Sequence, residues 1–406
     1  MSKADDDHKQ SAKSPALGRM LSIDALRGLA ALMVLVYHAR ASMWVGTGAT
    51  YREYGLSVNP NALLGYLSFP FSYGGLGVTL FFVLSGYCIH RRGARQIAQG
   101  REGELNWKSF ALRRFWRIYP TYVFALLLTM AIDHWLSLTH SPNPGQDNSL
   151  FSFVVSLFTL QGFIAPFYGS NGVFWTLAME IHLYLAYPLL FYLSRRIGPT
   201  RVLLMTLAVS LAYTVGQMAV GFESYLPHRF QRGPIFLPYW FTWTIGFYLA
   251  EVEAGRAKRL SNKTWATLVC VSLPIGLALT TLNKYLLAEV FCAIAFAGLI
   301  HGSLTPRGAE IWRWLGGRLF ATVGLFSYSL YAIHAPLLIA YHSLISPSDP
   351  THKFETLWPA LGGVLLAIPL AYFFFWGVES WSIRKASGAG ISKVDSAVIP
   401  VKANDQ

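Results

Sequence analysis

Charged side chains are scarce in this 406-residue sequence: Asp, Glu, Lys and Arg together make up 13% of it, against about 25% in soluble domains. Hydrophobic residues make up 53%, and the mean hydropathy is +0.39. They gather in blocks without charge, such as 203–215 and 361–376, which approach the roughly 20 residues that a bilayer-spanning helix needs. The scarcity of charge argues against an ordinary soluble domain and predicts an integral membrane protein.

Cysteine is also scarce. Cys88, Cys270 and Cys292 each stand alone in an apolar segment, without the paired spacing of a disulfide framework or a zinc site. We interpret them as packing residues and expect no metal. Acidic residues are fewer than basic ones, 20 against 33, which gives a net charge of +13. Because the basic residues cluster between apolar blocks, we attribute the excess to membrane topology and not to nucleic acid.

The apolar blocks predict an all-α, polytopic helical bundle with about ten transmembrane helices. The expected spans are 21–43, 73–90, 118–138, 172–194, 202–220, 234–252, 264–281, 285–302, 320–345 and 357–380. With this division 26 of the 33 Lys and Arg residues fall on one side, five on the other, and two, Arg27 and Arg40, within the first helix. The positive-inside rule then places both termini in the cytoplasm.

The expected organisation is a cytoplasmic tail at 1–20, a membrane domain at 21–380 and a disordered cytoplasmic tail at 381–406. Residues 150–168 are apolar but short, so we expect an outer-face or re-entrant segment there. A crossing at that point would invert every later loop and spoil the charge division. The N-terminus has no signal-peptide cleavage pattern, and the first helix is expected to stay in the mature protein.

The first helix carries ionisable residues that are expensive in a bilayer. A charge near the bilayer centre costs roughly 2.5 to 3.5 kcal/mol. Arg27 and His38 are eleven residues apart, which places them on one helix face and about 16 Å apart along the axis. His38 would lie about halfway through a ~30 Å hydrocarbon core. The pattern alone fits either a functional pair or a snorkelling arginine beside a hydrogen-bonded histidine.

Five segments together carry a family resemblance. They are LSIDALRGLAALMVLVYHAR, GGLGVTLFFVLSGYCIHRR, RRFWRIYP, FWTLAMEIHLYLAYPLL and FSYSLYAIHAPLL. Their order, and the spacing of Arg and His in the first, resemble the acyltransferase 3 family of membrane acyltransferases over residues 21 to about 380. One departure is Glu379, which is followed by Ser where relatives often have Pro soon after Glu, and we assign it no function. The esterase-like domain that follows in some relatives is not expected here.

The resemblance implies transfer of an acyl group from acyl-CoA to a hydroxyl. His38 is the expected general base, because a histidine with a pKa near 6.5 is suited to that role at neutral pH. We assign Arg27 and Glu180 to the catalytic site with it. Glu180 lies in an apolar helix, so it must pair or line a wet cavity, and a purely structural hydrogen bond is the alternative. No permanently bound cofactor is expected, since acyl-CoA is a substrate.

Eight basic residues lie in the expected cytoplasmic loop 91–117. Arginine recognises phosphate through bidentate hydrogen bonds, so Arg113, Arg114 and Arg117 are predicted to bind the CoA phosphates. For Arg91, Arg92 and Arg95 we prefer a role in topology and lipid contact.

Four further residues of the motifs are predicted to contact substrate: Ser85, Trp175, Tyr331 and His334. Ser85 with its neighbouring glycine also fits close helix packing. Tyr331 and His334, three residues apart on one face, are equally able to satisfy one another.

The preferred acceptor is a carbohydrate, such as lipopolysaccharide, exopolysaccharide or a lipid-linked sugar, and the preferred acyl group is acetyl. Acylation of a small molecule such as a macrolide is the alternative acceptor class. A transporter of acyl groups or lipid-linked sugars is the alternative from another class, although no inverted repeat is visible. The expected partners are acyl-CoA, the acceptor and membrane lipid, and the expected location is the bacterial inner membrane.

Overall fold

The computed structural model describes residues 3–101, 106–139, 146–219, 236–346, 349 and 352–388, with the backbone alone for 3–20 and 218. The described chain is helical, with two isolated bridges and no strand. The long helices are α1 (Lys3–Met43), α4 (Gly77–Ala98), α5 (Trp107–Thr139), α7 (Phe174–Ile197), α8 (Pro199–Ala219), α9 (Trp240–Glu253), α10 (Asn262–Thr281), α11 (Tyr285–Ser303), α14 (Ser327–Ile345) and α15 (Trp358–Phe374). Shorter elements are α2 (Thr47–Tyr54), α3 (Pro60–Leu67), η1 (Phe69–Leu76), α6 (Leu150–Leu157), η3 (Leu237–Tyr239), α12 (Pro306–Trp314), α13 (Gly317–Leu325), the π-helical turn η4 (Phe375–Glu379) and α16 (Ser380–Gly388).

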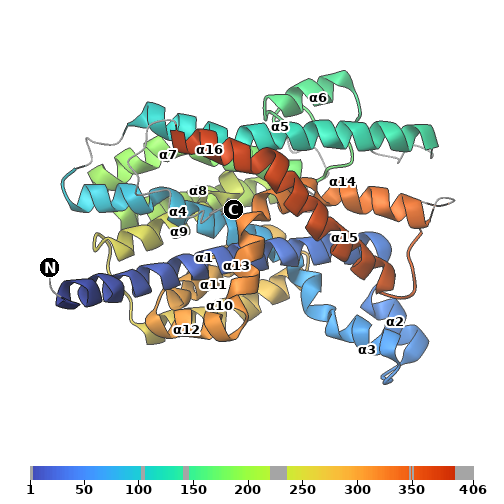
Figure 1. Cartoon of the computed structure of the whole chain (residues 1–406), viewed down its shortest axis with the longest axis horizontal. Helices are drawn as coiled ribbons and strands as arrows, with labels where there is room; N and C mark the ends of the chain where they lie inside the picture. Colours follow the sequence, from blue (N-terminus) through green and yellow to red (C-terminus); the bar gives the residue numbers. More distant parts are fainter. Residues whose placement is uncertain are drawn as a thin grey trace.

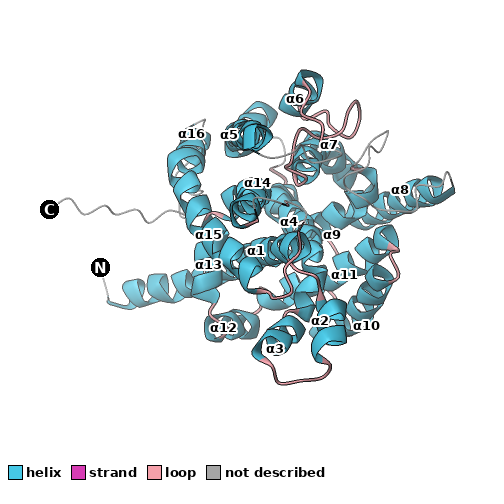
Figure 2. Cartoon of the chain, turned by 90° about the vertical axis from the view of Figure 1, so that its right-hand side faces the viewer, coloured by secondary structure: helices cyan, strands magenta, loops and turns pink. Residues whose placement is uncertain are grey.

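The long helices run roughly along one axis of the molecule (Figure 1). Viewed along that axis, α1, α4 and α14 lie near the middle and the other helices surround them (Figure 2). Within the described residues eight helices are long and apolar enough to cross a membrane, and a bent pair of helices raises the number to nine. The predicted polytopic helical bundle is therefore confirmed, and the chain is an integral membrane protein.

The crossing expected at 234–252 corresponds to α9, which has 14 residues, and the preceding residues 220–235 lie outside the described part of the chain. Twelve of its residues are buried, and it packs closely against α4. A Cβ added to Gly86 would lie 1.9 Å from the carbonyl oxygen of Trp243, and one added to Gly246 would lie 1.9 Å from that of Val83. Glycine at these two crossing points lets the backbones approach.

Three expected boundaries differ from the structure. The helix expected at 320–345 is bent by 74° between α13 and α14. Here α13 crosses α1 so closely that a Cβ on Gly324 would lie 2.0 Å from the carbonyl oxygen of Asp24. The basic loop expected at 91–117 is largely helical, because α4 continues to Ala98 and α5 begins at Trp107. The helix expected at 357–380 contains η4 and continues into α16.

Residues 150–168 contain only α6, whose eight residues span about 12 Å and cannot cross a bilayer. This agrees with the expected non-crossing segment. At the N-terminus, α1 begins at Lys3, so most of the expected tail is helical backbone. Residues 389–406 of the expected C-terminal tail lie outside the described residues.

Candidate active site

A cavity of about 840 Å³, counting its open mouth, lies between α1, α4, α5, α7 and α14. Its polar lining residues are Arg27, Ser85, Arg114, Arg117, Thr176, Glu180, Tyr184, Ser327, Tyr328 and Tyr331. Apolar residues such as Val78, Phe81 and Leu177 complete the wall. The cavity thus combines charged groups with a hydrophobic lining inside a membrane bundle.

Three arginines supply positive charge to the cavity. Arg27 forms a loose pair with Asp24, at 3.8 Å between Nη1 and Oδ1. Arg117 Nη1 lies 3.1 Å from Glu379 Oε1. Arg114 is different, because it makes no ion pair with a described residue, and its buried Nε has no hydrogen-bond partner. The Arg114 guanidinium lies 5.7 Å from the ring centroid of Phe110, and it is the arginine best placed to receive an anionic ligand.

Glu180 is held on the cavity wall by two neighbours. Its Oε1 accepts hydrogen bonds from Ser85 Oγ, at 3.2 Å, and from the Tyr184 hydroxyl. Ser85 Oγ in turn accepts a 3.2 Å hydrogen bond from Trp243 Nε1. Tyr184 lies one turn after Glu180 on the same face of α7. A hydroxyl and a carboxylate are therefore presented together to any ligand in the cavity.

His38 and His334 form a hydrogen-bonded pair, with 3.0 Å between His38 Nδ1 and His334 Nε2. His334 is buried, and its Nδ1 lies 2.8 Å from the carbonyl oxygen of Tyr331 and 3.1 Å from that of Leu330. Carbonyl oxygens only accept, so Nδ1 of His334 carries hydrogen. With both rings neutral, His334 Nε2 accepts from His38 Nδ1–H, and the lone pair of His38 is on Nε2.

Tyr331 connects the histidine pair to the cavity. Neither His38 nor His334 is among the cavity-lining residues, but Tyr331 is, and its ring centroid lies 5.6 Å from that of His334. The Tyr331 hydroxyl accepts a 2.7 Å hydrogen bond from Thr176. His38 is partly exposed. Tyr331 is thus the residue that both lines the cavity and contacts the histidine pair.

Glu379, to which the sequence assigned no role, is fully buried at the end of the π-helical turn. Besides the contact with Arg117, its Oε2 accepts hydrogen bonds from the backbone N–H and the hydroxyl of Ser329, at 3.0 and 2.6 Å. π-Helical turns are rare and are frequent at functional sites. Glu379 therefore orients Arg117, and Arg117 has a counter-ion before any ligand binds.

The structure brings most of the predicted site residues together. The cavity is lined by Arg27, Ser85, Arg114, Arg117, Glu180 and Tyr331. Besides His38 and His334, two predicted residues are not among the lining residues. They are Arg113 and Trp175, the second of which packs on Tyr239 with 5.6 Å between ring centroids.

Sequence reasoning missed several contributors to this site. Tyr184 is signalled by its position one turn after Glu180, and Tyr328 stands in one of the family-like segments. Cys88, expected to be a packing residue, lines the cavity. Arg91 and Arg95, for which a role in topology and lipid contact was preferred, both donate to Glu253, at 3.1 and 2.9 Å.

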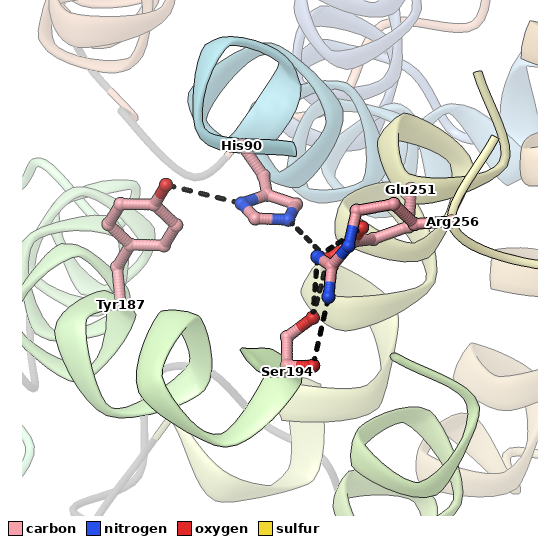
Figure 3. Close-up of polar contacts among 5 residues, drawn as sticks. All are labelled: His90, Tyr187, Ser194, Glu251 and Arg256. Carbon is pink, nitrogen blue, oxygen red and sulfur yellow. Dashed lines mark hydrogen bonds and ion pairs between the residues drawn. The ribbon is translucent and has the colours of Figure 1, made fainter. Parts of the chain in front are cut away.

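A second buried polar cluster lies outside the cavity (Figure 3). His90 Nε2 is 2.8 Å from Glu251 Oε1, and His90 Nδ1 is 3.2 Å from the hydroxyl of Tyr187. Arg256 Nη1 donates to both carboxylate oxygens of Glu251 at 2.7 Å. Ser194 Oγ adds a 2.5 Å hydrogen bond to the same carboxylate. This cluster ties α4, α7 and α9 together, and none of its residues lines the cavity described above.

The fold and the cavity define a class: an integral membrane protein with a cavity that is lined by three arginines and lies beside a histidine pair. The family model described as an acyltransferase domain matches residues 20–376, and the chain belongs to this family, acyltransferase 3. The similarity covers nearly all of the membrane domain, including every residue of the cavity.

Two relatives with names that describe an activity are similar to this chain. Peptidoglycan O-acetyltransferase OatA of Listeria monocytogenes is 22% identical over 382 residues, which is 90% of this chain and 56% of the relative. An O-acetyl transferase of Shigella phage Sf6 is 29% identical over 169 residues, 40% of this chain and 43% of the relative. The chain thus spans about half the length of these curated relatives. No solved structure matches the chain.

Proposed function

We propose that this chain is an O-acyltransferase that moves an acyl group, preferably acetyl, from acyl-CoA to a hydroxyl of a carbohydrate. The two similar relatives are named as O-acetyltransferases, one of them acting on peptidoglycan, which favours a polysaccharide-type acceptor in a bacterial inner membrane. The single observation that carries the proposal is the contact of the histidine pair with Tyr331, which lines the same cavity as three arginines.

The donor binds in the cavity with its phosphates at the arginines. Arg114 has no anionic partner among the described residues, so its guanidinium is available for bidentate phosphate contacts. Arg117, held by Glu379, adds a second cationic group. Arg113 is the weaker member of the predicted trio, because it is not a lining residue. The acyl-bearing arm then extends through the apolar part of the cavity toward Tyr331.

The chemical step uses His38 as general base. His38 Nε2 takes the proton from the acceptor hydroxyl as the oxygen attacks the thioester carbonyl carbon. The C–O bond forms, the C–S bond breaks, and the CoA thiolate leaves and receives the proton from His38. His334 fixes the tautomer of His38 and orients the ring. Glu180 and Ser85 line the cavity, where they position the donor arm.

The topology is part of the same proposal. The charge division favours both termini and the arginine end of the cavity in the cytoplasm, where acyl-CoA is made. Alkaline phosphatase fused after residue 406 is expected to be inactive, and fused near residue 145 it is expected to be active. An active C-terminal fusion would place the arginines on the side away from the donor.

The decisive assay uses purified protein in detergent with radiolabelled acetyl-CoA and a panel of acceptors: peptidoglycan fragments, lipopolysaccharide and a macrolide. CoA release that requires a carbohydrate acceptor, with label in the product, is the expected result. Label transfer to the macrolide alone would change the acceptor class. Binding of acetyl-CoA with no acceptor-dependent CoA release from any of the three would count against an enzyme.

A further inference from the structure

Arg40 carries a buried charge that no acidic side chain compensates. It lies in the last turn of α1, at the end of the bundle that bears α2 and α3 (Figure 1), and its side chain is 7% exposed. Its Nε donates to Ser68 Oγ at 3.1 Å, and its Nη1 donates to Ser72 Oγ at 3.0 Å. Its guanidinium also lies over the ring of Trp44, 4.9 Å from the centroid. All three partners are neutral.

Two partly buried arginines of the described chain have a counter-ion, unlike Arg40. Arg256 pairs with Glu251, and Arg117 with Glu379. Arg40 has no carboxylate within 4.0 Å among the described residues. Because removing a guanidinium from water without a negative partner is costly, the arrangement is that of an anion site.

The neighbouring groups supply further hydrogen-bond donors. Arg40 Nη2 has no acceptor in the described structure, and Ser72 Oγ accepts from Arg40 while its own hydrogen has no described acceptor. Ser68, in contrast, is fully used, since it also donates to the carbonyl oxygen of Gly65 at 2.7 Å. An arginine amino group and a serine hydroxyl are a common pair of donors to a phosphate oxygen.

The surroundings indicate what carries the phosphate. Four large apolar side chains flank the two serines along α3 and η1 and are exposed: Leu63, Leu67, Phe69 and Phe71. A free polar anion would gain nothing from them, whereas an amphiphile would cover them. We propose that Arg40 and Ser72 bind the phosphate group of a membrane amphiphile whose apolar chain lies against α3 and η1. This goes beyond the acyl-transfer function and does not depend on it, since no acyl donor takes part.

Binding of farnesyl phosphate to the purified full-length chain in a neutral detergent tests the site. Equilibrium dialysis with radiolabelled farnesyl phosphate gives Kd, and farnesol and inorganic phosphate serve as competitors. Farnesyl phosphate is expected to bind at least about tenfold tighter than either competitor, since the guanidinium recognises the phosphate and the chain covers apolar surface. Competition by inorganic phosphate at equal concentration would overturn the amphiphile, and equal binding of farnesol would overturn the anion site.

Variants locate the site. Arg40→Gln is expected to weaken farnesyl phosphate binding about tenfold and Ser72→Ala several-fold, because each removes a donor to the phosphate. Arg52→Gln is the matched control, since Arg52 is exposed on α2 at the same end of the bundle. Size-exclusion profiles report folding, and Ser72→Ala carries the test if Arg40→Gln does not fold. Unchanged Kd in Ser72→Ala, or an equal loss in Arg52→Gln, would overturn the proposal.

Discussion

Two histidine clusters in this molecule differ in how their charges are satisfied. His90 is fully buried, both of its ring nitrogens are hydrogen-bonded, and its ring stacks on Phe247 with centroids 3.4 Å apart. A carboxylate and an arginine complete that cluster. The chain of hydrogen bonds at His334 instead runs from two backbone carbonyls through His334 to His38, which is partly exposed. A histidine whose charge and hydrogen bonds are satisfied by buried neighbours indicates a structural cluster. A histidine whose tautomer is fixed by a buried histidine indicates a functional one.

The largest effect is expected at His38. His38→Gln removes the proton acceptor but keeps a polar side chain of similar reach, so turnover should fall at least about a hundredfold. The measurement is acceptor-dependent CoA release, and His182→Gln is the matched control in another helix. Turnover near that of the parent in His38→Gln would remove His38 from the mechanism.

Glu251→Gln tests the structural role of the His90 cluster. The change leaves the partly buried Arg256 beside a neutral amide, and breaking a buried ion pair costs about 3 to 5 kcal/mol. A clearly lower melting temperature in detergent is expected, with turnover per folded molecule close to that of the parent. Loss of turnover without loss of thermal stability would instead assign a functional role to this cluster.

His334→Asn should have an intermediate effect. Asparagine lacks the ring nitrogen Nε2 that fixes the tautomer of His38. We therefore expect about a 10- to 100-fold loss in kcat and a shifted pH–rate profile, with KM for acetyl-CoA close to that of the parent. A rise in KM with kcat unchanged would return His334 to the substrate-contact role that its sequence motif suggested.

The smallest effect is expected at Arg114. Arg114→Ala should raise KM for acetyl-CoA several-fold, Arg114→Lys less so, because lysine keeps the charge and loses the bidentate fork. Donor binding in the parent should weaken as salt rises. Arg318→Ala is a control on the short helix α13. An equal KM for acetyl-CoA in Arg114→Ala and the parent would indicate that Arg114 contributes only to membrane topology.

Much of this arrangement was predictable from the residues. Long apolar blocks predicted the helices, and family-like segments predicted that Arg27, Ser85, Arg114, Arg117 and Glu180 would meet, which they do in the cavity. The missed features depend on tertiary contacts. No local pattern marks the 74° bend, which arises where α13 crosses α1.

The role of Glu379 is the second feature that the sequence did not predict. In the sequence it departs from the family pattern, yet the π-helical turn rotates it inward onto Ser329 and Arg117. The sequence also did not predict that Trp175 and Arg113 are not cavity-lining residues. The spacing of residues along a helix does not determine which other helix each face contacts.

The proposed function requires that acyl-CoA occupies the cavity. Cys88 lines that cavity, Cys292 is buried, and Cys270 is exposed and can be replaced by serine. Alkylation of Cys88 by N-ethylmaleimide in the Cys270→Ser protein should slow at least several-fold when acetyl-CoA saturates, and the protection should weaken in Arg114→Ala because the phosphates lose a guanidinium. An alkylation rate of Cys88 that saturating acetyl-CoA leaves unchanged would contradict the account.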